Sequence, residues 1–204
     1  PENGGKAASL MAGFRAALAA GAEAVITLDG DGQHHPEDIP RFLARAETAP
    51  GAILFGSRMA HRRCFPAARY HANRIANFWI SWACGRWVED SQCGFRLYPR
   101  PALEAVRADD RRRHGFAFES EFLINAARAG FPFAAVPIAA IYPAAAARPS
   151  HFRPVADIAA IVGMVAGKLL SRGMDPVGLV RALRGRSAAR RQQAGRGEPE
   201  RLSA

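Results

Sequence analysis

Two aspartates separated by one glycine are the residues of this sequence best suited to chemistry. The run Asp29-Gly30-Asp31-Gly32-Gln33 follows a short apolar segment. Two carboxylates in one turn can share a divalent cation, and their hard oxygen atoms favour Mg²⁺ or Mn²⁺. Such an ion would neutralise a diphosphate leaving group. An ordinary surface Asp-Gly turn is the alternative, whereas an EF-hand is excluded because His34 and Pro40 occupy its glycine and glutamate positions.

The segments around this turn alternate between helix and strand patterns. Residues 5–20 are rich in alanine and predict a helix, and the β-branched apolar run from Ala24 to Leu28 predicts a buried parallel strand. A second helix starts at Pro36, and residues 52–56 predict a second buried strand. We therefore expect an α/β fold with a mostly parallel sheet flanked by helices, in which ligands bind beyond the carboxyl ends of the strands.

A longer helix is expected from about Ala67 to Cys84. Four of its apolar residues fall on one stripe, which we expect to pack in the core or to face a membrane: Ile75, Phe78, Trp79 and Trp82. Three polar residues fall on the opposite side: Arg69, Asn73 and Asn77.

The rest of the sequence divides into a domain and a C-terminal extension. Residues 89–98 predict a turn leading into a strand, and a helix from Phe118 ends before Gly130. We assign residues 1–153 to the domain, residues 154–184 to helices, and the Arg-rich residues 185–204 to a disordered tail. The longest apolar stretch, residues 155–170, is shorter than the roughly 20 residues of a spanning helix and contains two charges.

The charge balance points to anionic partners. The net charge is +10, and nearly all of the 28 basic residues are arginines. Attraction to phosphates of a nucleotide sugar, a lipid or an anionic leaflet would explain this bias, and so would a GC-rich genome. Nucleic acid is not expected as a partner, because the basic residues are not interleaved with aromatic ones in a known module. Three cysteines without metal-ligand spacing fit a reducing compartment.

Five segments together give the sequence a family resemblance. The run VITLDGDGQHHPEDI, residues 25–39, resembles the metal-binding region of family 2 glycosyltransferases of the inverting GT-A type. Four further segments resemble elements of that family in the same order: Asn3–Lys6, Gly56–Arg58, Asp90–Arg96 and Phe118–Glu121. The set is most similar to the polyprenyl-phosphate (dolichol-phosphate) mannose synthase branch and covers roughly residues 3–155.

This resemblance implies roles for individual residues. Asp29, Asp31 and Gln33 match the metal and diphosphate site. Arg58 and Arg69 match arginines that hold a lipid-acceptor phosphate, which suits a guanidinium fork. The expected phosphate contacts also include Lys6 and a loop over the diphosphate with Ser150, His151 and Arg153. For each of these residues, ordinary solvated charge or an inert loop position is the alternative.

Three carboxylates match catalytic positions of the family. Asp90 is expected to orient the donor sugar, and Glu119 or Glu121 stands where a general base is found. A sugar-hydroxyl acceptor needs such a base, whereas a lipid phosphate is already ionised near neutral pH. The alternative for Glu119 and Glu121 is that they are acids at a helix N-terminus favoured by its dipole.

The resemblance implies an inverting transferase that moves a sugar from a nucleotide diphosphate sugar to a polyprenyl phosphate or another lipid. The expected location is cytoplasmic, at the inner face of the cell membrane, although the C-terminal helices could instead cap the sheet or pair with another subunit. The nucleoside-binding strands of the family are expected to precede this chain, which looks truncated. A sugar-phosphate nucleotidyltransferase and an inactive partial domain with a binding role are the alternatives.

Overall fold

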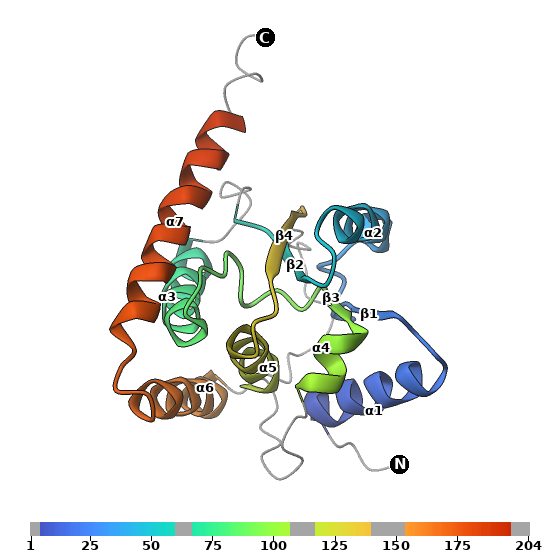
Figure 1. The fold of residues 1–204 in the computed structure, drawn as a ribbon, viewed down its shortest axis with the longest axis horizontal. Coiled ribbons are helices and arrows are strands. Elements are labelled where there is room, and N and C mark those ends of the chain that lie inside the picture. Colours follow the sequence, from blue (N-terminus) through green and yellow to red (C-terminus); the bar gives the residue numbers. More distant parts are fainter. Residues whose placement is uncertain (1–4, 60–66, 107–116, 140–153, 197–204) are drawn as a thin grey trace.

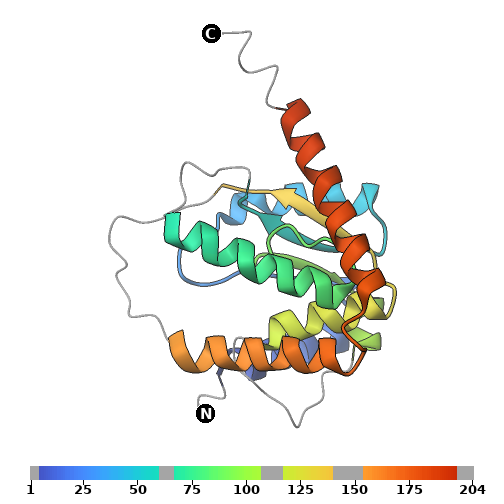
Figure 2. The same ribbon diagram turned by 90° about the vertical axis from the view of Figure 1, so that its left-hand side faces the viewer.

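A computed structural model describes residues 5–59, 67–106, 117–139 and 154–196 of the chain. These residues form a four-stranded sheet with helices on both faces (Figure 1, Figure 2). The strands are β1 (Ala24–Thr27), β2 (Ile53–Ser57), β3 (Arg96–Pro99) and β4 (Phe133–Pro137), in the spatial order β1-β3-β2-β4. The expected α/β architecture is confirmed.

The sheet is mixed in direction. β2 and β4 are parallel, while β3 lies between β1 and β2 and is antiparallel to both, so three of the four strands run the same way. β2 is buried along its length, as predicted. The strand expected at residues 24–28 is confirmed as β1, but its expected burial and parallel neighbour are wrong, since it is only partly buried and pairs antiparallel with β3. A short apolar run does not reveal its neighbours, which are set by the topology of the whole sheet.

Alternate side chains of β2 face two separate cores. Leu54 packs in the cluster that contains Phe42 of α2 (Ile39–Thr48), which follows a short 3₁₀ turn η1 (Pro36–Asp38). Ile53 and Phe55 point to the opposite face and pack in a cluster with residues of several other helices. These are α1 (Gly5–Ala19), α3 (Ala67–Cys84), α4 (Arg100–Ala105), α5 (Ala117–Arg128) and α6 (Pro154–Leu170).

The apolar stripe of α3 lies only partly in the core. Ile75 is 62% exposed and Trp79 is 42% exposed, so the apolar stripe is partly turned outward. Asn77 is buried instead, and its side chain donates to the carbonyl of Glu89 and accepts from the backbone N–H of Ser91. A buried asparagine with both polar ends satisfied is stable, whereas periodicity alone would place it in solvent.

Two helices form the last described part of the chain. α6 lies beside α3, and α7 (Pro176–Arg196) crosses their ends and rises past the sheet (Figure 2). The sequence predicted a helix ending near residue 184, but α7 continues to Arg196, because arginine, glutamine and alanine are good helix formers. No helix in the described ranges combines the length and the apolar character needed to cross a bilayer.

Asp175 caps the N-terminus of α7. Its Oδ1 accepts a hydrogen bond from the N–H of Gly178 at 2.8 Å, and its Oδ2 accepts one from Nη1 of Arg128 in α5 at 2.8 Å. The hydrogen bond from Gly178, together with the Arg128 guanidinium, holds the pKa of Asp175 below its usual range. The same carboxylate therefore starts the helix and ties it to the domain.

Replacing Asp175 with alanine is expected to lower the free energy of unfolding by about 1 kcal/mol at neutral pH. Because the pKa is lower in the folded than in the unfolded state, this stabilisation is complete above about pH 4 and is lost as the pH falls through the folded value. Urea unfolding at several pH values should show the difference between wild type and Asp175→Ala shrinking in acid. Asp175→Asn, which keeps the cap, should lose less, and a difference independent of pH would contradict this account.

Candidate active site

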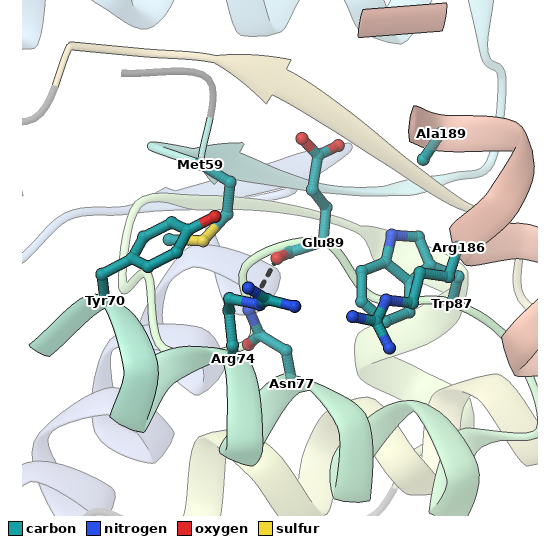
Figure 3. A pocket seen from close by; sticks show the side chains of 8 residues that line it. All are labelled: Met59, Tyr70, Arg74, Asn77, Trp87, Glu89, Arg186 and Ala189. Atoms are coloured by element: carbon teal, nitrogen blue, oxygen red, sulfur yellow. Dashed lines mark hydrogen bonds between the residues drawn. The ribbon is translucent and has the colours of Figure 1, made fainter. Parts of the chain in front are cut away.

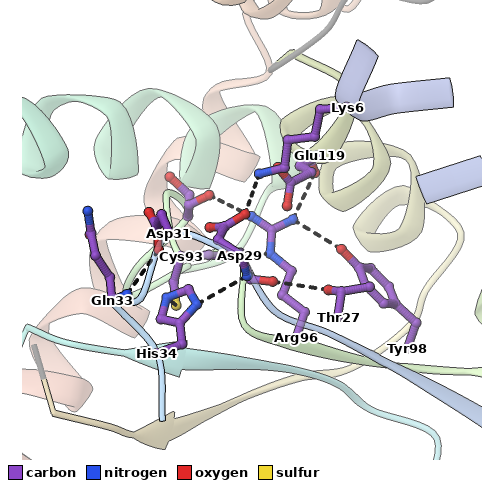
Figure 4. Close-up of polar contacts among 12 residues, drawn as sticks. Lys6, Thr27, Asp29, Asp31, Gln33, His34, Cys93, Arg96, Tyr98 and Glu119 are labelled. Carbon is purple, nitrogen blue, oxygen red and sulfur yellow. Dashed lines mark hydrogen bonds and ion pairs between the residues drawn. The ribbon is translucent and has the colours of Figure 1, made fainter. Parts of the chain in front are cut away.

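Three charged side chains from separate elements meet beyond the end of β1 (Figure 4). Lys6 is in the first turn of α1, Asp29 follows β1, and Glu119 is in the first turn of α5. Nζ of Lys6 lies 2.8 Å from Oδ1 of Asp29 and 2.5 Å from Oε2 of Glu119. The lysine thus bridges two carboxylates that are distant in the sequence, and it joins one predicted metal ligand to one predicted catalytic residue.

Mutual attraction favours the charged forms of Lys6 and Asp29. Burial acts to raise the pKa of Asp29, but the Lys6 ammonium outweighs it, and the pKa lies below its usual range. Burial likewise acts to lower the pKa of Lys6, and the charges of Glu119 and Asp29 raise it instead. Asp29 is therefore available as an anion at neutral pH.

Asp31 lies at the surface of the same turn. Its Oδ1 accepts a hydrogen bond from the backbone N–H of Gln33 at 3.0 Å, and the residue is exposed. Asp29 and Asp31 thus present carboxylate oxygens to solvent from one loop, with the side chain of Asp29 28% exposed. Within the described residues no group of three or more potential metal-ligating side chains occurs. Two carboxylates with the remaining positions left to water and phosphate oxygens are a usual arrangement for Mg²⁺.

A buried histidine, His34, forms a hydrogen bond with the backbone of this loop. Nδ1 of His34 lies 3.3 Å from the backbone nitrogen of Asp29 and accepts its hydrogen, while Nε2 lies 3.6 Å from Sγ of Cys93. Burial lowers the pKa of His34 and raises that of the Cys93 thiol to about 12. The neutral imidazole fixes the backbone of the acidic turn, a role that the sequence did not indicate.

Arg58 and Asp90 form a buried ion pair beside the cluster. Nε and Nη2 of Arg58 lie 2.8 Å and 3.0 Å from Oδ2 and Oδ1 of Asp90, whose side chain is fully buried. The backbone N–H of Arg58 also donates to this carboxylate. The structure thus joins the residue predicted for the acceptor phosphate to the residue predicted for the donor sugar.

Arg96 anchors the loop that carries Asp90. It is 1% exposed, and its guanidinium donates to the carbonyl oxygens of Ser91 and Cys93 at 2.8 Å and of Glu119 at 3.1 Å. These bonds connect the loop to the N-terminus of α5. The Gly-Phe-Arg segment was the available signal for this residue, but the sequence assigned no separate role to its arginine.

The other predicted site residues lie elsewhere. Glu121 forms an ion pair with Lys168 of α6 at 2.9 Å, so of the two α5 glutamates only Glu119 joins Lys6. Arg69 is in α3, and the position of its side chain is not described. Three further predicted residues lie outside the described ranges: Ser150, His151 and Arg153.

Gly94 leaves space for the carboxylate of Asp29. A Cβ atom added at Gly94 would lie 2.2 Å from Oδ2 and 2.6 Å from Oδ1 of Asp29. Gly94→Ala is therefore expected to push Asp29 away from Lys6 and to lower the activity of the full-length protein by about tenfold or more. Gly13→Ala is the control, because a Cβ there meets no atom within 4 Å. Equal initial rates for the two variants would contradict the role given to Gly94.

Residues 1–107 of the chain match the family model described as glycosyl transferase family 2. The chain is 30% identical over 142 residues to an undecaprenyl-phosphate mannosyltransferase of Micrococcus luteus, which is 66% of this chain and 56% of that protein. It is 29% identical over 137 residues to a polyprenol monophosphomannose synthase of Mycolicibacterium smegmatis, 66% of this chain and 51% of that protein. It is 30% identical over 144 residues to a UDP-N-acetylglucosamine–dolichyl-phosphate N-acetylglucosaminyltransferase of Methanococcus voltae, 69% and 57% of the two chains. The chain thus spans little more than half the length of these relatives.

Proposed function

Because the chain belongs to glycosyltransferase family 2, we propose that it transfers a sugar from a nucleotide diphosphate sugar to a polyprenyl phosphate or another lipid-linked acceptor. The names of the relatives specify undecaprenyl-phosphate, polyprenol and dolichyl-phosphate substrates, which supports this class of acceptor. The observation that carries the proposal is the pair of carboxylates, Asp29 and Asp31, on the loop beyond β1. Direct attack of the acceptor on the anomeric carbon would invert its configuration.

Asp29 and Asp31 are the proposed ligands of Mg²⁺ or Mn²⁺, with Gln33 beside them. These residues fit a divalent cation, since both carboxylates belong to one solvent-facing loop. The pKa of Asp29 lies below its usual range, and Asp31 is exposed. When bound, such an ion supplies positive charge for the diphosphate leaving group. Lys6, which already contacts Asp29, adds a second positive charge at the same place.

Glu119 and Asp90, the acidic members of two ion pairs, are proposed to hold Lys6 and Arg58 in position, and not to accept a proton from the acceptor. Glu119 is held by Lys6, and both oxygens of Asp90 are held by Arg58. A lipid phosphate attacks as an anion and needs no base, so this arrangement suits a phosphate acceptor better than a sugar hydroxyl.

We also propose that the helical side of the molecule rests on a membrane surface, at the inner face of the cell membrane. Three neighbouring helices expose large apolar side chains: Ile75 and Trp79 on α3, Ile158 and Val162 on α6, and Val177 and Val180 on α7. Arg181 and Arg184, each four residues after Val177 and Val180 on α7, add positive charge beside them. Apolar area combined with positive charge is typical of helices that lie on an anionic leaflet.

Incubation of the full-length protein with a panel of nucleotide sugars and a polyprenyl phosphate tests the proposal. We expect a glycosylated lipid that forms with Mn²⁺ or Mg²⁺ and is absent after chelation. Formation of a nucleotide sugar from a sugar phosphate would instead indicate a nucleotidyltransferase. Absence of any product with all donors would indicate a binding role without catalysis.

A further inference from the structure

A pocket lies between α3, α7 and the segment that precedes Asp90 (Figure 3). Its lining includes six large side chains: Met59, Tyr70, Arg74, Trp87, Glu89 and Arg186. Met59 follows Arg58 in the chain and Glu89 precedes Asp90, so the pocket adjoins the buried ion pair of the candidate active site. Arg186 belongs to α7, which lies outside the residues matched by the family model.

Each arginine of the pocket lies against an aromatic ring. Cζ of Arg74 is 5.7 Å from the ring centroid of Tyr70, and Cζ of Arg186 is 5.8 Å from that of Trp87. Cation–π contact within about 6 Å restricts where each guanidinium lies. Each ring thus has a guanidinium group over one face, and the two positive charges favour an anionic ligand.

The charged residues of the pocket and the fixed backbone beside them also suit an anionic ligand. Among the described residues that line the pocket there are two guanidinium groups and one carboxylate, and in Figure 3 the carboxylate of Glu89 points away from Arg74. Nδ2 of Asn77 donates to the backbone carbonyl of Glu89 at 2.7 Å, while its Oδ1 accepts from the N–H of Ser91 at 2.8 Å. The backbone of residues 89–91 is therefore fixed to α3, and the two arginines reach the pocket from different helices, α3 and α7.

We propose that Arg74 and Arg186 bind the phosphate group of a lipid in this pocket. That the ligand is a lipid rests on the proposed function, whereas the preference for a phosphate follows from the two arginines that line the pocket. Two of the N–H donors of Arg58 are engaged with Asp90, so further guanidinium groups beside it would supply additional donors for a lipid phosphate. Planar forks with several N–H donors suit phosphate oxygens. The phosphate can belong to the polyprenyl acceptor or to a phospholipid of the bilayer.

Vesicle binding by the purified chain tests the proposal at physiological salt, where isolated surface charges are screened. Phosphatidylcholine vesicles carry either a polyprenyl phosphate or the same fraction of phosphatidylglycerol. Arg74→Gln and Arg186→Gln are each expected to weaken binding by about tenfold, the loss of one charge-assisted hydrogen bond. Arg191→Gln is the matched control on the same helix, exposed and outside the pocket, and should weaken binding by less than about threefold.

The outcomes separate the ligand sources. A loss confined to polyprenyl-phosphate vesicles supports the acceptor as the ligand, and equal losses on both vesicles support a bilayer phospholipid. The proposal is overturned if Arg191→Gln loses as much as Arg186→Gln, or if the double variant binds both vesicles like wild type. Arg74→Lys and Arg186→Lys keep the positive charge without the planar guanidinium, so their vesicle affinity should lie between those of the wild type and the glutamine variants. Thermal unfolding identifies any variant that misfolds.

This assay is independent of sugar transfer. If the protein binds lipid phosphate through the pocket but transfers no sugar, the pocket proposal is supported and the proposed function is wrong. If it transfers sugar but binds vesicles without any contribution from Arg74 and Arg186, the reverse holds.

Discussion

Asp31→Asn in the full-length protein is expected to lower sugar transfer by about 100-fold or more, the effect of losing metal-assisted charge stabilisation worth several kcal/mol. Asp31 is exposed and is held only at Oδ1, by the N–H of Gln33, among the contacts described for its side chain. Its removal should therefore leave the fold intact. Initial rates measured over a range of Mn²⁺ concentrations should show a higher metal requirement together with a lower maximal rate.

Glu37→Gln provides the matched control for this change. Glu37 lies in η1, close in sequence to the acidic turn, and its side chain is 82% exposed. The substitution removes the same single negative charge, so it controls for the general electrostatic field of the loop. A similar loss in both variants, or full activity of Asp31→Asn, would show that Asp31 does not bind the metal.

Arg96→Met is expected to lower the free energy of unfolding by about 3–5 kcal/mol, because three buried hydrogen bonds from a charged donor are lost together. Three backbone carbonyl oxygens, those of Ser91, Cys93 and Glu119, would each lose a hydrogen bond in the interior. An unsatisfied buried acceptor costs about 1–3 kcal/mol. Urea unfolding followed by circular dichroism measures the change, and the loop with Asp90 should be released together with the start of α5.

Arg100→Met is the control for Arg96→Met. Arg100 starts α4, and its Nε lies 2.7 Å from Oε1 of Glu104 with both side chains well exposed. An exposed pair of this kind contributes less than about 1 kcal/mol. If the two variants were equally stable, the anchoring role of Arg96 would be wrong, and the shape of the Asp90 loop would have to depend on other contacts.

Contacts between distant segments decided which predicted residues belong together. Glu119 and Glu121 are equivalent in sequence terms, since both are acids at one helix start. They separate in space because side chains two positions apart on a helix point in different directions, and one meets Lys6 while the other meets Lys168. The pairing of Arg58 with Asp90 is likewise set by the packing of two loops beyond β2 and before β3.

The sequence by itself determined where the helices lie, apart from the end of α7, and also the buried character of β2 and the acidic turn, because these depend on local composition and on the period of apolar residues. It also determined the family, through motifs in a fixed order. Only the tertiary structure decided that β1 pairs antiparallel with β3 and that Asn77 is buried, and it also brought Arg186 of α7 to Arg74 of α3. The physical reason is that burial and charge pairing depend on segments far apart in the chain, and their approach is fixed by the packing of the whole domain.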